Sequence, residues 1–85
     1  MKIMNKTVTI IMPVFNEVSY IYKIVRRVNK CIKFKKQIII VDDYSSDGTR
    51  KIIKKIKNID KKIFYKKNLG KGAAIKSAVP FIKGD

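Results

Sequence analysis

The stretch Ile38-Ile-Ile-Val-Asp-Asp-Tyr-Ser-Ser-Asp-Gly-Thr49 decides the fold, because an apolar run stops abruptly there at two adjacent carboxylates. Four branched aliphatic residues in a row are typical of a strand that is buried on both faces, as in parallel sheets. Asp42 and Asp43 follow at the end of this strand, and Asp47 and Gly48 belong to a turn that leads into a helix. Ligands of open α/β sheets bind beyond the carboxyl ends of the strands, so the two acids are placed to hold a ligand.

Two further strands are predicted on either side of this one in the sequence. Residues 7–12 are β-branched and short, and we expect that strand to end at Pro13. Residues 62–65 suggest a weaker third strand. Residues 34–37 are predicted to be a basic connection into the strand over residues 38–41.

Three helices complete the pattern. After Glu17, apolar residues recur at the helical spacing i, i+3, i+4, i+7 and i+11, in one stripe made of Ile21, Ile24, Val25, Val28 and Ile32. A second helix is expected to begin near Asp47, capped by Asp47 or Ser46, with Ile52, Ile53 and Ile56 facing inward. A third helix follows a glycine-marked turn at residues 68–72 and should end or kink near Ala78, ahead of Pro80.

The resulting order, β-α-β-α-β-α, predicts an α/β fold with a Rossmann-like parallel sheet and right-handed crossovers. A chain of 85 residues provides one domain at most. We therefore expect an N-terminal tail at residues 1–6 and a single domain over residues 7–85.

The chain carries a net charge of +15, which raises the question of an acidic partner. The lysines are spread over every segment, mostly opposite the apolar positions, so a solvated charged surface is the favoured interpretation. An acidic partner such as a phosphate, an anionic lipid or a nucleic acid is the alternative. A nucleic-acid partner is not expected, because the chain shows no aromatic stacking platform or recognition helix.

Composition also limits the chemistry and the location. Cys31 is the single cysteine and the chain has no histidine, so a disulfide, a zinc site and a base-activated thiol are not expected. No apolar run approaches the roughly 20 residues that span a membrane. We expect a cytoplasmic location.

Three segments should converge at one edge of the sheet: Pro13-Val-Phe-Asn-Glu17, Asp42-Asp-Tyr-Ser-Ser-Asp-Gly48 and Asn68-Leu-Gly-Lys-Gly72. Together they resemble the N-terminal part of a family 2 glycosyltransferase, an inverting, nucleotide-sugar-dependent enzyme with a GT-A fold. That family's motifs read Pro-x-aromatic-Asn-Glu, Val-Asp-Asp-x-Ser-x-Asp-Gly-Thr and Asn-x-Gly-Lys-Gly-Ala-Ala, and the match covers roughly residues 7–85. The third motif is most similar to the branch that transfers a hexose to a polyprenyl phosphate, as dolichyl-phosphate mannosyltransferases do.

The resemblance implies a nucleotide-sugar site made of Pro13, Phe15, Glu17, Ile40, Asp42 and Lys71. It implies that Asp42 accepts the imide N–H of a uracil or guanine base, for which an ionised carboxylate is suited. Ile40 would supply a backbone contact, and the loop from Pro13 to Glu17 would line base and ribose. Lys71 would add a charge near the diphosphate, beside the free N–H groups of a helix.

Structural alternatives stay open for each of these residues. Asp42 would otherwise be a loop or cap residue, Glu17 a first-turn helix acid, and Lys71 a solvated lysine beside glycines that allow close packing. Asp43, Asp47 and Gly48 are expected to be structural, with Asp43 bound to backbone amides. Tyr44 stands where many relatives have glycine, which bears on the shape of the loop.

The resemblance also implies what this chain would lack. In that family a metal-binding Asp-x-Asp follows the segment similar to residues 83–85, and a catalytic base comes much later. We therefore expect a partial GT-A domain that stops before the Asp-x-Asp, with no catalytic or metal-binding residue of its own, whereas the intact enzyme would use Mg²⁺ or Mn²⁺. A fourth strand would pair beside residues 7–12, and without it that edge of the sheet is exposed.

The resemblance thus implies a glycosyltransferase, or a remnant of one, that transfers a hexose from a GDP- or UDP-sugar with inversion. The acceptor would be a polyprenyl phosphate or an envelope glycan, at the cytoplasmic face of the membrane, and the isolated chain would be inactive. The alternative is a non-enzymatic nucleotide-binding half-domain whose sheet is completed by a second chain.

Overall fold

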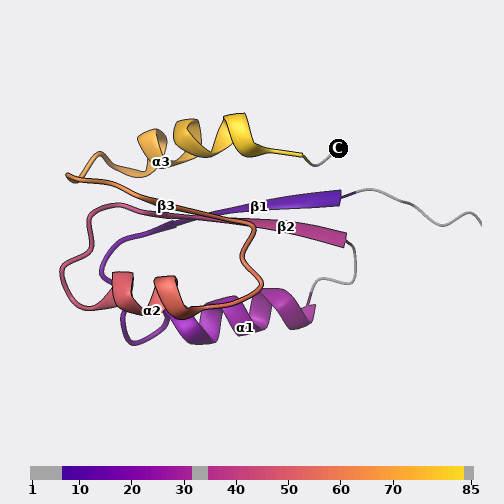
Figure 1. The fold of residues 1–85 in the computed structure, drawn as a ribbon, viewed down its shortest axis with the longest axis horizontal. Helices are drawn as coiled ribbons and strands as arrows, with labels where there is room; N and C mark the ends of the chain where they lie inside the picture. Colours follow the sequence, from indigo (N-terminus) through magenta and orange to yellow (C-terminus); the bar gives the residue numbers. More distant parts are fainter. Residues whose placement is uncertain (1–6, 32–34, 84–85) are drawn as a thin grey trace, which may run out of the picture.

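The computed structural model describes residues 7–31 and 35–83. Within these ranges the chain forms a three-layer α/β fold with alternating strands and helices, which confirms the predicted fold class (Figure 1). The predicted tail at residues 1–6, the position of Ile32 and the last two residues lie outside the described part of the chain. No helix in the described part is both long enough and apolar enough to cross a bilayer.

The sheet consists of three parallel strands in the order β1-β2-β3, with β2 in the centre. Strand β1 spans Thr7–Val14, β2 spans Lys35–Asp42 and β3 spans Lys61–Phe64. The register places Val14 opposite Asp42 and Asp42 opposite Phe64, so the three carboxyl ends are level with one another.

Helices cover both faces of the sheet. Helix α1 (Ile21–Cys31) and helix α2 (Thr49–Lys55) lie on one face, and α3 (Lys71–Ala78) lies on the other (Figure 1). A short 3-10 turn, η1 (Val79–Phe81), follows α3 directly, as predicted from Pro80, so the helix ends at Ala78.

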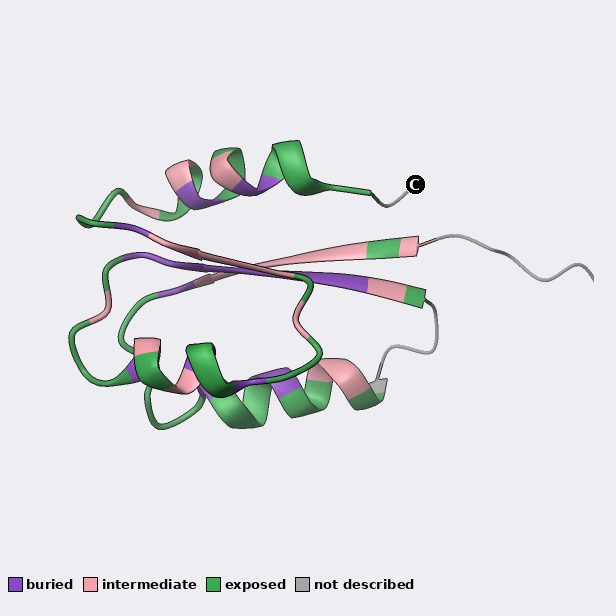
Figure 2. Ribbon diagram, in the orientation of Figure 1, coloured by how far each residue is buried: buried purple, intermediate pink, exposed green. Residues whose placement is uncertain are grey.

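Two apolar clusters form because alternate residues of β2 point to opposite faces. Ile38 and Ile40 pack with Ile53 and the helices α1 and α2, whereas Ile39 and Val41 pack with α3. The central strand is therefore buried on both faces, and Figure 2 shows its buried residues between the helical layers. This outcome confirms the interpretation of the aliphatic run at residues 38–41.

Strand β2 begins earlier than expected, because residues 35–37 belong to it and not to a connection. Gln37 is buried, and its amide oxygen accepts hydrogen bonds from the Thr9 hydroxyl (3.0 Å) and the Lys83 amide (2.8 Å). Its amide nitrogen donates to the Phe81 carbonyl at 2.6 Å. Partners distant in the sequence thus satisfy a polar residue that, taken alone, is typical of a loop.

Strand β1 continues through Pro13 to Val14, so the predicted end of this strand at Pro13 was wrong. The Val14 carbonyl accepts the Asp43 N–H at 2.8 Å and therefore points toward β2. Backbone groups alternate along a strand, so Pro13 directs its own toward the edge at which β1 has no partner among the described strands. The missing N–H of proline removes no sheet hydrogen bond there.

Two details of the helices were not predicted from the sequence. Ile24 is 39% exposed and lies outside the buried stripe of α1 that Ile21 and Val25 form, so the inward position predicted for it was wrong. The Nζ of Lys62 donates to the carbonyls of Lys54 (3.3 Å) and Ile56 (2.7 Å), which satisfies the carboxyl end of α2.

Candidate functional site

The loops that follow β1 and β2 are bound to each other at the carboxyl edge of the sheet. The backbone N–H of Asn16 donates to the Ser45 hydroxyl, and the Ser46 N–H donates to the Asn16 side-chain oxygen, each at 2.8 Å. The Glu17 N–H donates to the Thr49 hydroxyl at 3.0 Å. These reciprocal bonds hold the first two sequence motifs in one rigid unit.

Asp43 connects the third motif to this unit. Its buried carboxylate accepts the N–H groups of Leu69 (2.6 Å) and Gly70 (2.9 Å), and its carbonyl accepts the Asn68 side-chain N–H at 3.3 Å. The expectation that Asp43 binds backbone amides is confirmed. This side chain therefore fixes the turn that leads into α3.

We expect Asp43→Ala to lower the free energy of unfolding by about 2–3 kcal/mol, because hydrogen bonds to an ionised group contribute about 1.5–3 kcal/mol each and these two share one acceptor group. Urea denaturation measures the loss. Asp43→Asn, which keeps one acceptor oxygen, serves as the matched control and should lose about half as much. Equal stability of Asp43→Ala and the wild type would contradict this role.

Asp42 points to the opposite face from Asp43, as alternation along a strand requires. Its side chain is fully buried, and its Oδ2 accepts the Ser45 N–H (3.1 Å) and pairs with the Nε of Arg50 at 2.6 Å. Its Oδ1 is buried and has no hydrogen-bond partner. Because a buried acceptor without a partner costs about 1–3 kcal/mol, this oxygen stands out as a position for a ligand donor.

Arg50 lies outside the three sequence motifs, but its pairing with Asp42 places it in this cluster. Its guanidinium lies 5.7 Å from the ring centre of Tyr44 and 5.4 Å from that of Phe64, and it also donates to the Tyr65 carbonyl. The sequence contains one indication of a special role for this residue, because only three of the 21 basic residues are arginines. Arginine is the residue that combines bidentate pairing with aromatic stacking.

A pocket of about 330 Å³ opens between the β1–α1 loop and the start of α3. Of the six predicted site residues, four line this pocket: Pro13, Phe15, Glu17 and Lys71. Val14 and Asp43 complete the lining. The convergence of the first and third motifs at one cavity is thus observed, and it supplies an aromatic face, a carboxylate and a cation.

The other two predicted residues do not line this pocket. Ile40 lies in the middle of β2 with its side chain in the core, between Met12 and Lys62 on the neighbouring strands. Asp42 lies opposite Val14, which does line the pocket, but the side chain of Asp42 turns toward Arg50. A nucleotide contact by either residue stays a prediction.

The turn before α2 depends on glycine and on Asp47. Helix α2 begins at Thr49, two residues later than expected, and Gly48 takes the N-cap position with φ +99°, a conformation that favours glycine. Tyr44 adopts φ +66°, which in a residue with a side chain costs about 1–2 kcal/mol. The loop thus has a left-handed, glycine-like conformation at Tyr44.

Asp47 accepts the Thr49 N–H and the Val18 N–H, each at 3.1 Å, and also the Thr49 hydroxyl. Burial by itself would raise the pKa of Asp47, but the bonds from Thr49 and Val18 outweigh it and lower this pKa below its ordinary value of 3.8. The carboxylate of Asp47 therefore favours the folded state only while it is ionised.

The stabilisation by Asp47 should accordingly be complete above the unfolded pKa of 3.8 and disappear as the pH falls through the lower folded-state value. We expect the urea midpoint of the wild type to fall more steeply between about pH 5 and pH 2.5 than that of Asp47→Asn. The difference between the two pH profiles gives the contribution of the Asp47 carboxylate alone, because all other carboxylates are present in both proteins. Parallel pH profiles would contradict the assignment.

The carboxylates do not fit a magnesium or manganese site in the described ranges. No group of three or more acids or other metal-ligating side chains occurs there. Asp42, Asp43 and Asp47 are each bound to Arg50 or to backbone amides, as described above.

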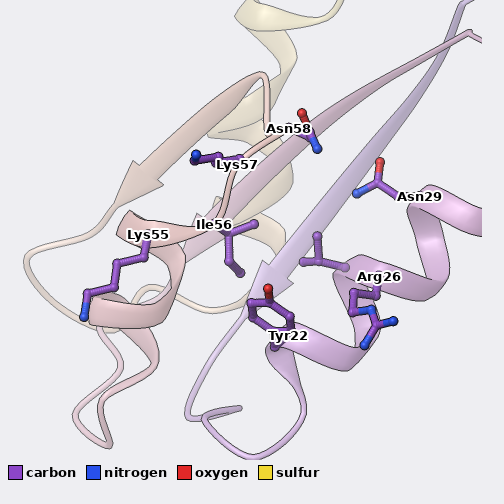
Figure 3. Close-up of a pocket in the computed structure, with 8 residues that line it drawn as sticks. Tyr22, Arg26, Asn29, Lys55, Ile56, Lys57 and Asn58 are labelled. Atoms are coloured by element: carbon purple, nitrogen blue, oxygen red, sulfur yellow. The ribbon is translucent and has the colours of Figure 1, made fainter.

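A different pocket, of about 290 Å³, lies between α1 and the end of α2 (Figure 3). Tyr22, Arg26 and Asn29 line it from α1, and Lys55 to Asn58 line it from the other side, with Val25 in its wall. It contains none of the predicted site residues.

The family model described as glycosyl transferase family 2 matches residues 9–85, a range that includes all three motifs and both loops of the site. A search of the curated proteins found no match, and a search of the solved structures found none either. Because the matched range covers most of the chain, the chain belongs to glycosyl transferase family 2.

Proposed function

We propose that this chain binds a nucleotide-sugar in the pocket at the carboxyl edge of its sheet. The observation that carries the proposal is the convergence of Pro13, Phe15, Glu17 and Lys71 on one cavity of about 330 Å³. Three parallel strands with alternating helices are consistent with the N-terminal half of a GT-A domain, and such sheets bind ligands at this edge.

Each lining residue has a chemistry that suits one part of a nucleotide. Phe15 is 47% exposed and its ring offers a flat apolar face to a base, while Glu17 can accept hydrogen bonds from ribose hydroxyls. Lys71 is the first residue of α3, where its charge adds to the free N–H groups of the helix end and favours a diphosphate. The unpaired Oδ1 of Asp42, which does not itself line this pocket, would accept the N–H of a base that extends beyond it.

We infer a hexose donor that carries GDP or UDP, because Asp42 as an acceptor suits the imide N–H that guanine and uracil share. In the transfer, an acceptor oxygen attacks the anomeric carbon with inversion, the bond to the diphosphate breaks, and the nucleoside diphosphate leaves. This chemistry belongs to the family; no residue described here is assigned to the chemical step.

We further propose an acidic acceptor, a polyprenyl phosphate or an envelope glycan, at the cytoplasmic face of the membrane. Support comes from the net charge of +15, since basic segments are attracted to anionic membrane surfaces. In the intact enzyme we expect Mg²⁺ or Mn²⁺ to be held by residues other than those described here. The isolated chain is expected to bind nucleotide weakly and to transfer no sugar.

A second candidate function is a non-enzymatic half-domain that is completed by another chain. One observation favours it: within the described sheet, β1 pairs with β2 only, so its other edge offers unpaired backbone groups to a further strand. The two candidates share the nucleotide pocket and differ in whether sugar transfer follows binding.

NMR titration of the chain with UDP, GDP and ADP tests the shared pocket. We expect UDP or GDP to shift the amide resonances of Phe15, Glu17 and Lys71 at lower concentration than ADP, because adenine lacks an imide N–H. Equal responses to all three nucleotides, or responses confined to the pocket lined by Tyr22 and Arg26, would contradict the proposal. Sugar transfer by the isolated chain would contradict its expected inactivity.

A further inference from the structure

We propose that Arg50 is a positioning residue for base recognition, which holds the Asp42 carboxylate so that Oδ1 selects bases with an imide N–H. This inference rests on the proposed nucleotide pocket and adds to it a residue outside the three motifs. Arg50 would not contact the ligand; it would act through Asp42.

Contacts from two separate segments hold the Arg50 guanidinium in place. Its guanidinium lies within cation–π distance of the rings of Tyr44 and Phe64, at 5.7 and 5.4 Å, and it also donates to the Tyr65 carbonyl. These contacts come from the β2–α2 loop and from the end of β3, so two separate segments fix one planar group. A fixed guanidinium loses little further freedom when it binds a carboxylate.

Only one of the two Asp42 carboxylate oxygens has hydrogen-bond partners. Oδ2 receives both available donors, the Arg50 Nε at 2.6 Å and the Ser45 N–H at 3.1 Å. Oδ1 receives none, although it is buried. Two donors on one oxygen prevent rotation of the carboxylate, so the other oxygen keeps one direction as a free acceptor.

The chemistry of a carboxylate decides which base edges it can bind. An ionised carboxylate can only accept, so it favours a base edge that donates an N–H and disfavours one that presents an unprotonated ring nitrogen. Uracil and guanine carry such an N–H beside a carbonyl, whereas adenine and cytosine present a lone pair at the corresponding ring position. A carboxylate that rotated freely would point an acceptor oxygen at the base less often, so it would bind the bases that carry this N–H more weakly.

The burial of Oδ1 adds one requirement. Because this oxygen is buried in the free chain, a base can reach it only when the atoms that cover it move. The carboxylate itself does not have to move, since Arg50 keeps its hold on Oδ2. Binding then gives the buried oxygen the partner that it lacks, which favours the complex.

The test uses Arg50→Met and Arg50→Lys, with Lys51→Met as the matched control. Lys51 is the next residue on α2, is exposed and carries the same charge. Far-UV circular dichroism and urea denaturation establish that each variant is folded. Two readouts follow: the Ser45 amide resonance without ligand, and the NMR titration slopes for UDP, GDP and ADP.

We expect Arg50→Met to shift the Ser45 resonance and to weaken UDP and GDP binding about tenfold, while ADP binding stays unchanged. Arg50→Lys should restore little of the preference, because an ammonium lacks the planar fork. Lys51→Met should match the wild type. If Arg50→Met unfolds, the folded Arg50→Lys variant decides by the same two readouts.

The failures are distinguishable. If the wild type prefers UDP or GDP over ADP and the folded Arg50 variants keep the same preference, then Asp42 works without Arg50 and this inference is overturned alone. If the wild type shows no preference, the proposed pocket is overturned and the inference with it.

Discussion

Replacing Ile53 with alanine is expected to lower the free energy of unfolding by about 3–4 kcal/mol, within the range of about 2–5 kcal/mol found for isoleucine-to-alanine changes in cores. Ile53 is fully buried on α2 and packs in the cluster that includes Ile40 and Ile21. The substitution removes apolar contacts and leaves a cavity that the small domain cannot fill. For 85 residues the whole stability is only about 4–13 kcal/mol, so the loss is a large fraction of it.

Urea denaturation followed by circular dichroism measures the effect through the shift of the midpoint. Ile24→Ala is the matched control, because Ile24 is 39% exposed on α1 and outside the cluster. That variant should stay within about 1 kcal/mol of the wild type. Equal losses for the two variants would mean that α2 does not pack on the sheet as the structure has it.

Asp42→Asn is expected to remove most of the preference for UDP and GDP, with an affinity loss of at least about tenfold, or 1.4 kcal/mol. The amide has the same shape as the carboxylate but no charge, so it loses the charge-assisted bond to a base N–H and the ion pair with Arg50. If the amide nitrogen of the asparagine takes the position of Oδ1, an N–H donor faces the N–H donor of the base, and no hydrogen bond forms between them. NMR titration with the three nucleotides measures the change.

Asp60→Asn controls for the loss of one negative charge. Asp60 precedes β3, and its Oδ2 accepts the Ile38 N–H at 2.7 Å, a bond that the amide oxygen of asparagine can keep. This variant should bind nucleotides as the wild type does. A nucleotide preference that survives in Asp42→Asn would assign base recognition to other residues of the pocket.

Asp42→Asn should also be slightly less stable, since Arg50 loses its partner. The Arg50 side chain is 30% exposed, so water can solvate the guanidinium. The free energy of unfolding should therefore fall by only about 1 kcal/mol. The expected change in nucleotide preference is thus separable from the change in stability.

Local sequence patterns were enough for the architecture. The aliphatic run before Asp42 predicted a strand buried on both faces, and the helical spacing of Ile21 and Val25 predicted the buried side of α1. Pro80 marked the end of α3 at Ala78. Each of these features depends on neighbours within a few residues, and for that reason a single sequence contains them.

The site was predictable only in part. The three motifs pointed to the carboxyl edge of the sheet, and Pro13, Phe15, Glu17 and Lys71 do meet at one pocket there. The prediction that Asp43 binds backbone amides is confirmed by its bonds to Leu69 and Gly70, but the motifs did not reveal that the Asp42 carboxylate turns toward Arg50.

Sequence alone therefore determined the order of strands and helices, the parallel sheet and the edge of the sheet at which the motifs meet. Tertiary structure alone decided that Gln37 is buried in β2, that β1 runs through Pro13, and that Arg50 holds one oxygen of Asp42 and leaves the other free. The reason is the sequence separation of the partners: Gln37 bonds to Thr9 and Lys83, and Arg50 to Asp42 and Tyr65. Hydrogen bonds over such separations satisfy polar groups that no local pattern marks as buried.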